Sequence, residues 1–283
     1  MSEAPSRLIV GCGYLGSQVA HRWLADGSRV YAITRTAARA AELASRGIEP
    51  IIADVTRPDA LPALPAMATM FWAVGFDRTS GASHHDVHVA GLGRLLDALP
   101  GHPRPILSSS TGVWGDEGGG IVNETTPAHP AREAGRVLLE AEALLRGHRL
   151  GPGVALRFAG LYGPDRLPRI ADLEAGRPLA ADPDSWLNLI HVDDAAAIVC
   201  GIAAATAPAP LYVVSDGHPV RRRDWYGHIA ACLGSPPPTW DTDAPRSRGA
   251  DKRVVPSLLF HDLPITLAHP DPLAAITDLV RQA

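Results

Sequence analysis

A glycine-rich turn between a buried strand and an amphipathic helix constrains this chain more than any other feature. The turn spans residues 11–16 (GCGYLG) and directly follows the apolar run Arg7–Val10. In such a turn the first glycine permits a tight bend, the second lets the backbone approach a pyrophosphate, and the third lets helix and strand pack closely. A merely flexible turn is the alternative. The context favours a dinucleotide site, with predicted contacts from Gly11, Gly13, Tyr14, Leu15 and Gly16.

The first half of the chain alternates short apolar runs with helical patterns. A helix is predicted over Ala37–Arg46, with Thr36 as its cap and Gly47 at its end. Another carries leucines at helical spacing between His88 and Leu99. The βαβα order predicts an α/β fold with a doubly wound parallel Rossmann sheet. The predicted strands are Arg7–Val10, Arg29–Ile33, Ile51–Ala53, Met70–Val74, Pro105–Ser109 and Val154–Phe158.

The rhythm becomes irregular after residue 160. Residues 163–184 are rich in Pro, Gly and Asp and predict a long loop with at most a short helix. A strand over Leu187–His191, a helix over Asp193–Ala204 and a strand over Leu211–Val214 follow. Asp224 is expected to cap a further helix, and residues 235–257 are expected to be mostly loop.

Cofactor choice is encoded where the second strand ends. An acidic residue there would favour NAD, because it accepts hydrogen bonds from the adenosine ribose. The sequence has Thr34, Arg35 and Thr36 instead. Arg35 suits a 2′-phosphate, which predicts NADP over NAD, and a solvated surface arginine is the alternative. The predicted contacts also include Asp54, which could otherwise cap a turn, and Val74 and Gly75 after the fourth strand.

Composition narrows the functional classes that remain open to this chain. The net charge is −4, so no basic field invites nucleic acid or an anionic membrane. The longest apolar run, Ala195–Ala205, is too short to span a bilayer, and the N-terminus lacks the shape of a signal peptide. Three widely spaced cysteines form no disulfide framework or metal knuckle. We therefore expect a cytoplasmic protein without a metal site; His84 and His88 lie one helical turn apart but have no evident third ligand.

Several further segments, in order, resemble the extended short-chain dehydrogenases, the NAD-dependent epimerase/dehydratase family. They are SSSTGVWG (108–115), NETTP (123–127), LRFAGLYGP (156–164), NLIHVDD (188–194) and LYVV (211–214). The resemblance implies a Rossmann domain over residues 1–160, completed by about 187–214. It also implies a smaller C-terminal substrate-binding domain over 161–283, interleaved with the first.

One departure from that family concerns its catalytic Tyr-x-x-x-Lys pair. Lys252 is the only lysine of the chain, so the pair cannot form in its usual place. Alignment on Glu140 puts Arg132 at the tyrosine position and Arg136 at the lysine position. Arg132 cannot be a general acid or base because guanidinium does not deprotonate in proteins. Arg136 could still hydrogen-bond a ribose.

Two other residues are candidates for the proton path. By the resemblance, Ser110 occupies the position of the family's catalytic serine or threonine and could bind a substrate carbonyl or hydroxyl. Tyr162 would lie near the nicotinamide, or else be a structural aromatic. The predicted catalytic set is therefore Ser110, Tyr162 and Arg136.

The hypothesis that follows is an NAD(P)-binding oxidoreductase or epimerase-like enzyme that acts on a small or sugar-like carbonyl or hydroxyl substrate, a nucleotide-sugar among them. Arg221–Arg223 are either a clamp for a nucleotide diphosphate or a solvated connection. A catalytically silent NADP-binding sensor or scaffold is the alternative function. The resemblance also implies a homodimer through helices at 85–99 and 132–146.

Overall fold

The computed structural model describes residues 4–57, 61–167, 169–241 and 250–282, and they divide into two compact units. The first unit comprises Met1–Ser110, Arg132–Arg157 and Ala196–Tyr212. The second comprises Thr111–Ala131, Phe158–Ala195 and Val213–Ala283. The predicted domain boundary near residue 160 stays a prediction.

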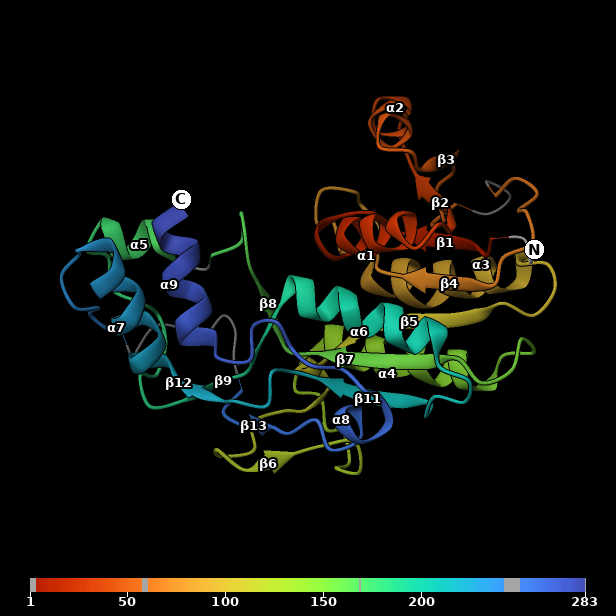
Figure 1. Cartoon of the computed structure of the whole chain (residues 1–283). Helices are drawn as coiled ribbons and strands as arrows, with labels where there is room; N and C mark the ends of the chain where they lie inside the picture. Colours follow the sequence, from red (N-terminus) through yellow and green to blue (C-terminus); the bar gives the residue numbers. More distant parts are fainter. Residues whose placement is uncertain (1–3, 58–60, 168, 242–249, 283) are drawn as a thin grey trace. The chain divides into compact units, whose positions relative to one another are not determined.

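The first unit is built on a seven-stranded sheet in the order β11-β7-β5-β4-β1-β2-β3 (Figure 1). The neighbours of β1, which are β2 and β4, run parallel to it, as do the pairs β2–β3 and β4–β5. This doubly wound parallel sheet confirms the predicted Rossmann fold class. The strands are β1 (Ser6–Val10), β2 (Arg29–Thr34), β3 (Glu49–Ile52), β4 (Thr69–Trp72), β5 (Arg104–Ser110), β7 (Val154–Phe158) and β11 (Leu211–Val214).

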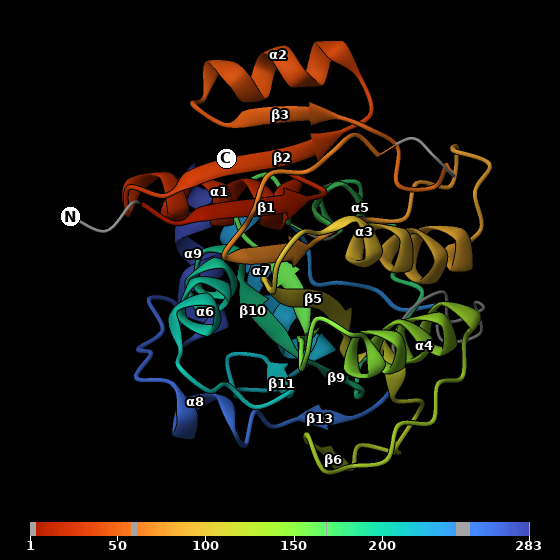
Figure 2. The same cartoon turned by 90° about the vertical axis from the view of Figure 1, so that its right-hand side faces the viewer.

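Helices cover both faces of this sheet (Figure 2). Alternation along β1 sends Leu8 and Val10 to one face and Ile9 to the other, where α1 packs so closely that a Cβ on Gly16 would lie 3.2 Å from Ile9 Cγ2. Arg104 ties the end of α6 to β5 through hydrogen bonds to the carbonyls of residues 202, 203 and 205. The helices are α1 (Tyr14–Ala25), α2 (Ala37–Ser45), the π-helix η1 (Asp86–Gly91), α3 (Leu92–Ala98), α4 (Glu133–Gly147) and α6 (Val192–Ala204).

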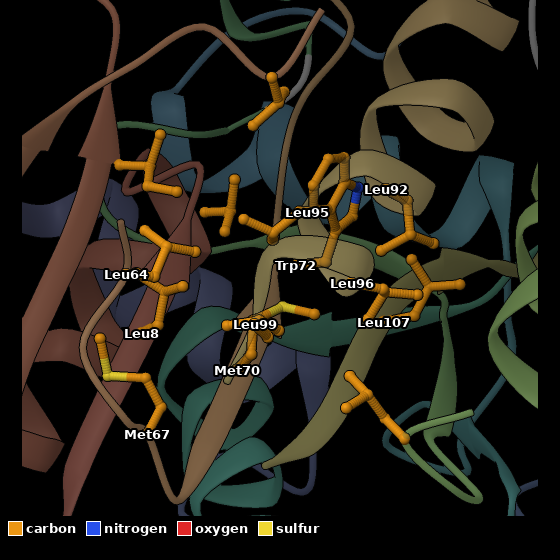
Figure 3. Packing of buried hydrophobic residues seen from close by; sticks show 14 of the residues in the cluster. Leu8, Leu64, Met67, Met70, Trp72, Leu92, Leu95, Leu96, Leu99 and Leu107 are labelled. Carbon is orange, nitrogen blue, oxygen red and sulfur yellow. The ribbon is translucent and has the colours of Figure 1, made fainter. Parts of the chain in front are cut away.

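The main core of the first unit lies between the sheet and the helices α3 and α4. Met70 and Trp72 of β4 are fully buried there, with Leu92, Leu95, Leu96, Leu99 and Leu107 around them (Figure 3). Burying a large apolar side chain contributes roughly 1.5–3 kcal/mol. This packing fixes the sheet, and therefore the place where its strands end.

The described residues of the second unit form two-stranded sheets and short helices beside an apolar core of their own. Its core gathers Tyr162, Leu173, Trp225, Ile229 and Ile276. Among the described residues of the loop over 163–184, the short α5 is the one helix, as predicted. The paired strands are β8 (Gly160–Tyr162) with β10 (Leu189–His191), β9 (Trp186–Leu187) with β12 (Val220–Arg221), and β6 (Ile121–Val122) with β13 (Arg253–Val254). The α-helices are α5 (Ile170–Glu174), α7 (Arg222–Leu233), α8 (Leu259–Asp262) and α9 (Pro272–Gln282); the 3₁₀ turn η2 (Thr111–Val113) precedes β6.

Two predictions of local structure are wrong. The strand expected over Leu187–His191 is broken at Asn188, whose side chain donates to Lys252 O at 2.9 Å and accepts from Val254 N at 2.7 Å. Asn188 thus joins the backbone of another segment, and β9 and β10 pair with different strands. Asp224 does not cap α7, because the helix already begins at Arg222; Asp224 lies in its first turn, where its charge suits the helix dipole.

Other local predictions are confirmed. Thr36 caps α2, and its hydroxyl accepts the amide of Arg39 at 3.2 Å. Gly47 follows the helix with a φ of 78°, which glycine adopts without strain.

Of the loop expected over residues 235–257, the stretch 242–249 lies outside the described residues. Within the described part of the chain, no helix combines the length and apolarity that crossing a membrane requires.

Candidate cofactor site

A cavity of about 250 Å³ opens in the first unit where four parallel strands end. Ligands bind at this edge of open α/β sheets because the loops that follow the strands converge there. The cavity is bordered by the glycine-rich turn and by the residues after β2, β3 and β4. Its lining includes Gly11, Gly13, Thr34, Arg35, Arg39, Asp54, Thr56, Val74, Gly75, Asp77 and Ser80.

The glycines of the turn are needed for two different reasons. Gly11 has a φ of +91°, and a Cβ on it would lie 2.6 Å from the carbonyl oxygen of Ala73. Gly16 is equally enclosed, since its Cβ would lie 2.4 Å from Gly11 O. A Cβ on Gly13 or Gly75 would meet no described atom within 4 Å, although both residues line the cavity. The protein's own packing therefore accounts for Gly11 and Gly16, whereas Gly13 and Gly75 leave open space for a ligand.

The start of α1 faces the same region with no carboxylate in its first turn. Gly13 is the N-cap and offers no side chain to cap the helix. The partial positive charge of a helix N-terminus favours an anion at this place. The turn thus combines room with a field that suits a phosphate group.

Arg35 pairs with another lining residue, Asp77, which the sequence analysis did not predict. Its Nη2 donates to Asp77 Oδ2 at 3.1 Å. Hydrogen bonds from the Thr79 hydroxyl and amide, together with the bond from Arg35, lower the pKa of Asp77 to about 2. Asp77 is therefore a carboxylate at neutral pH, and Arg35 is paired rather than merely solvated.

Asp54 and Arg39 complete the charged lining. Asp54 Oδ1 accepts the amide of Thr56 at 2.9 Å and its hydroxyl at 2.6 Å, so Asp54 closes the turn after β3. Burial alone would raise the pKa of Asp54, but these bonds and the charges of Arg35 and Arg57 hold it below its usual value. Arg39, on α2, donates to the carbonyl of Cys12 at 2.8 Å. Two arginines and two aspartates thus face one cavity.

Several predicted contacts lie beside this lining rather than within it. Tyr14, Leu15 and Gly16 begin α1, and Thr36 serves as the cap of α2. Arg39, Thr56, Asp77 and Ser80 were missed by sequence reasoning. A signal for Arg39 and Asp77 existed, because Arg39 lies in the first turn of the helix that follows Arg35, and Asp77 follows Gly75 by two residues.

Ser110 and Arg136 lie on neighbouring elements of the first unit, β5 and α4. Ser110 is half-buried at the end of its strand, and Arg136 is exposed in the first turn of its helix. Arg132, which the family resemblance aligns with the tyrosine position, is the N-cap of that helix. The end of β5 thus presents a hydroxyl, and α4 presents a guanidinium.

A buried ion pair fixes β5, β7 and α4 to one another. Glu142 accepts from the Ser109 hydroxyl at 2.6 Å and from Arg157 Nε and Nη2 at 3.0 and 2.7 Å. The Glu142 side chain is 1% exposed and that of Arg157 is 7% exposed. The two parallel bonds give the pair a fixed geometry. This carboxylate, and not the exposed Glu140 used for alignment, anchors α4 to the sheet beside Ser110.

Tyr162 lies in the apolar core of the second unit. Its ring makes edge contacts with His191 and Trp225, at centroid distances of 5.2 and 5.6 Å. Its hydroxyl is buried, and no described residue forms a hydrogen bond with it. Burial, followed by the charges of Asp216 and Asp194, raises the pKa of Tyr162 far above its usual value. These surroundings are typical of a structural aromatic side chain.

Lys252 is a buried structural residue of the second unit. It is 5% exposed, and its ammonium donates to the carbonyls of Trp114 and Gly115 at 3.3 and 3.5 Å. The only lysine of the chain thus holds the segment after η2.

Arg221–Arg223 are engaged within the second unit. Arg221 stacks on the Trp186 ring at 3.8 Å, Arg222 donates to Ser185 Oγ at 2.8 Å, and Arg223 pairs with Asp184. These contacts describe a packed connection between β12 and α7.

Among the described residues, His191, Asp193 and His269 bring metal-type ligand atoms within 4.8 Å of one another. The two imidazole rings are 3.7 Å apart between centroids and are tilted by 38° with respect to each other. His191 Nδ1 accepts the amide of Asp193 at 3.3 Å, which caps α6. Elsewhere, His84 stacks on Phe76, and burial and then the charge of His84 lower the pKa of His88 to about 4. The expected absence of a metal site stays a prediction.

Comparison with known proteins agrees with this geometry. A model of the NAD dependent epimerase/dehydratase family matches residues 8–214. Protein YeeZ of Escherichia coli K12 is 33% identical over 279 residues, which cover 94% of this chain and 96% of YeeZ. A Methylobacillus flagellatus structure named for NAD-dependent epimerase/dehydratases has a TM-score of 0.78 at 29% identity, over 99% of both chains. MoeE5, solved with UDP-glucose and NAD, has a TM-score of 0.76 at 21% identity, over 98% of this chain and 99% of its own.

Proposed function

Because this chain belongs to the NAD-dependent epimerase/dehydratase family, we propose that it binds a nicotinamide dinucleotide in the cavity of the first unit, and NADP in preference to NAD. The observation that carries this proposal is the cavity itself, at the carboxyl ends of β1, β2 and β4. Its open space at Gly13 and Gly75, and the uncapped start of α1, fit a pyrophosphate. Relatives of the same fold are described in complex with NAD.

The preference for NADP rests on Arg35. An acidic residue at the end of the second strand would repel a 2′-phosphate, whereas a guanidinium pairs with it. Arg35 and Arg39 both line the cavity, so two guanidinium groups border the space after β2. Replacing Arg35 by alanine should weaken NADPH binding about tenfold and NADH binding far less, which titration calorimetry measures directly. Equal losses for the two cofactors would refute the assignment.

The proposed reaction is oxidoreduction or epimerisation at a small or sugar-like carbonyl or hydroxyl group. The nicotinamide supplies hydride chemistry when the cofactor is bound. The chain's own part is to orient the substrate and to move a proton. We assign to Ser110 the hydrogen bond to the substrate oxygen, and to Arg136 a hydrogen bond to the cofactor ribose. The buried hydroxyl of Tyr162 makes Ser110 the better candidate for contact with substrate.

Nucleotide-sugars are the first substrates to test, since MoeE5 is described with UDP-glucose and with UDP-glucuronic acid. The assay mixes the protein with stoichiometric NADPH or NADP and a panel of such sugars, and follows absorbance of the reduced nicotinamide. Ser110→Ala should abolish turnover while its dissociation constant for NADPH stays within twofold of the wild type. A variant that keeps its turnover would remove Ser110 from the mechanism.

A second candidate function has its own support. By the family resemblance, Arg132 aligns with the tyrosine position, and the Tyr162 hydroxyl is buried among side chains of the second unit. Both observations favour a catalytically silent NADP-binding sensor or scaffold. Tight NADPH binding without turnover on any sugar of the panel would support this alternative. The homodimer implied by the family resemblance stays a prediction, which sedimentation velocity can test.

A further inference from the structure

The Arg35–Asp77 pair changes what Arg35 can offer a cofactor. A guanidinium that reads a 2′-phosphate gives its N–H donors and its positive charge to that phosphate. Here one of the donors, on Nη2, is already directed at Asp77 Oδ2. The positive charge is balanced in the same place by a carboxylate that lines the same cavity.

Asp77 is held in this position by its own turn. Its Oδ1 accepts the Thr79 amide at 2.9 Å and the Thr79 hydroxyl at 2.6 Å. Its carbonyl accepts the Ser80 hydroxyl at 2.7 Å. With Oδ1 fixed by the turn, Oδ2 points at Arg35. The carboxylate is therefore preorganised and does not arrive there by chance rotation of a free side chain.

A phosphate that approaches Arg35 meets this fixed negative charge. It must share the guanidinium with Asp77 or displace it, and like charges close to each other repel in either case. An adenosine ribose with a free 2′-hydroxyl carries no such charge. This repulsion therefore weakens the binding of a cofactor that carries a 2′-phosphate, and it does not affect a cofactor that lacks one.

We propose that Asp77 is a specificity-determining residue that opposes Arg35 and limits the preference of this site for NADP over NAD. This inference rests on the proposed dinucleotide function. Arg35 attracts the 2′-phosphate, Asp77 reduces that attraction, and the ratio of the two affinities is set by the pair.

The test replaces Asp77 by asparagine. The Asn Oδ1 can still accept from Thr79 and keep the turn, while the amide group that replaces Oδ2 is a donor and cannot hold Arg35. Calorimetric titration with NADPH and with NADH should show NADPH binding strengthened by about fivefold, with NADH within twofold of the wild type. The gain should shrink as salt is raised, because the groups involved are exposed.

Asp26 offers a matched control. Its Oδ1 accepts the amide and hydroxyl of Ser28, two residues on, and its Oδ2 accepts Arg7 at 3.0 Å. This is the same local arrangement as at Asp77, but it lies outside the cavity lining. Asp26→Asn removes the same charge and should leave both affinities unchanged.

Two results would overturn the inference. Weaker NADPH binding by Asp77→Asn would show that Asp77 positions Arg35 for the phosphate. An unchanged ratio of NADPH to NADH affinity would show that Asp77 has no part in selection. In both cases the proposed function survives if the wild type binds a dinucleotide. Wild-type protein that binds neither cofactor would instead refute the function and the inference together.

The double variant separates competition for Arg35 from direct repulsion. If Asp77 acts by occupying Arg35, Asp77→Asn should have little effect on NADPH binding in an Arg35→Ala background. The full fivefold gain in that background would assign the effect to direct repulsion of the phosphate.

Discussion

Removal of the buried carboxylate of Glu142 should destabilise the protein far more than removal of the whole ion pair. Glu142→Ala leaves the guanidinium of Arg157 and the Ser109 hydroxyl without their common acceptor, in a place where the Arg157 side chain is 7% exposed. Loss of one partner of a buried pair typically costs about 3–5 kcal/mol. Since total stabilities are about 5–15 kcal/mol, this is a large fraction.

A double substitution that removes both charges provides the comparison with Glu142→Ala. Glu142→Leu with Arg157→Met replaces both charges by apolar side chains of similar length. Such exchanges are often neutral or stabilising. We therefore expect the double variant to be more stable than Glu142→Ala by about 2 kcal/mol or more.

Urea unfolding followed by far-UV circular dichroism measures these differences through the transition midpoint. Because β5, β7 and α4 meet at this pair, its loss should also disturb the elements that carry Ser110 and Arg136. Glu140→Ala, on the exposed face of the same helix, is the control and should change stability by less than about 0.5 kcal/mol. A Glu142→Ala protein as stable as the Glu140→Ala control would refute the reasoning.

Three further predictions concern other parts of the chain. Gly11→Ala should lower the free energy of unfolding by about 1–3 kcal/mol, because φ is +91° and the new Cβ would meet Ala73 O; a thermal melt that matches the wild type would contradict this. Burial raises the pKa of Asp216 to about 7, so between pH 4 and pH 7 the folded state holds a proton that the unfolded state has released. The free energy of unfolding should therefore fall by up to about 4 kcal/mol from pH 4 to pH 7, and Asp216→Asn should flatten this pH profile in urea titrations. Trp72→Ala should lower the free energy of unfolding by about 3–5 kcal/mol, because it leaves a buried cavity. Trp72→Phe should lower it much less, since no described residue accepts from the indole N–H, and equal losses would contradict the cavity argument.

Sequence patterns predicted the parts of this fold that depend on local periodicity. The alternating apolar runs and the cap at Thr36 are local signals, and the sheet and α2 follow them. The break at Asn188 was not predictable, because its cause is a pairing with residues 252–254, more than sixty positions away. The local sequence LNLIH (187–191) does not indicate which distant backbone the Asn188 side chain will bind.

The candidate site divides in the same way. Sequence can indicate the turn at residues 11–16 and the residues after each strand, because each of them directly follows a recognisable strand. The partner of Arg35 could not be predicted in this way. Asp77 lies 42 positions away, and the two residues meet only because β2 and β4 flank β1 in one sheet. The burial of Tyr162 likewise depends on Trp225 and His191, which come from other elements.

The most direct test of the central claim is a calorimetric titration of the purified protein with NADPH and NADH side by side, repeated with Arg35→Ala. We predict that both cofactors bind at one site per chain, that NADPH binds more tightly, and that the variant loses this difference. Absence of binding by either cofactor would contradict the assignment of the cavity as a dinucleotide site.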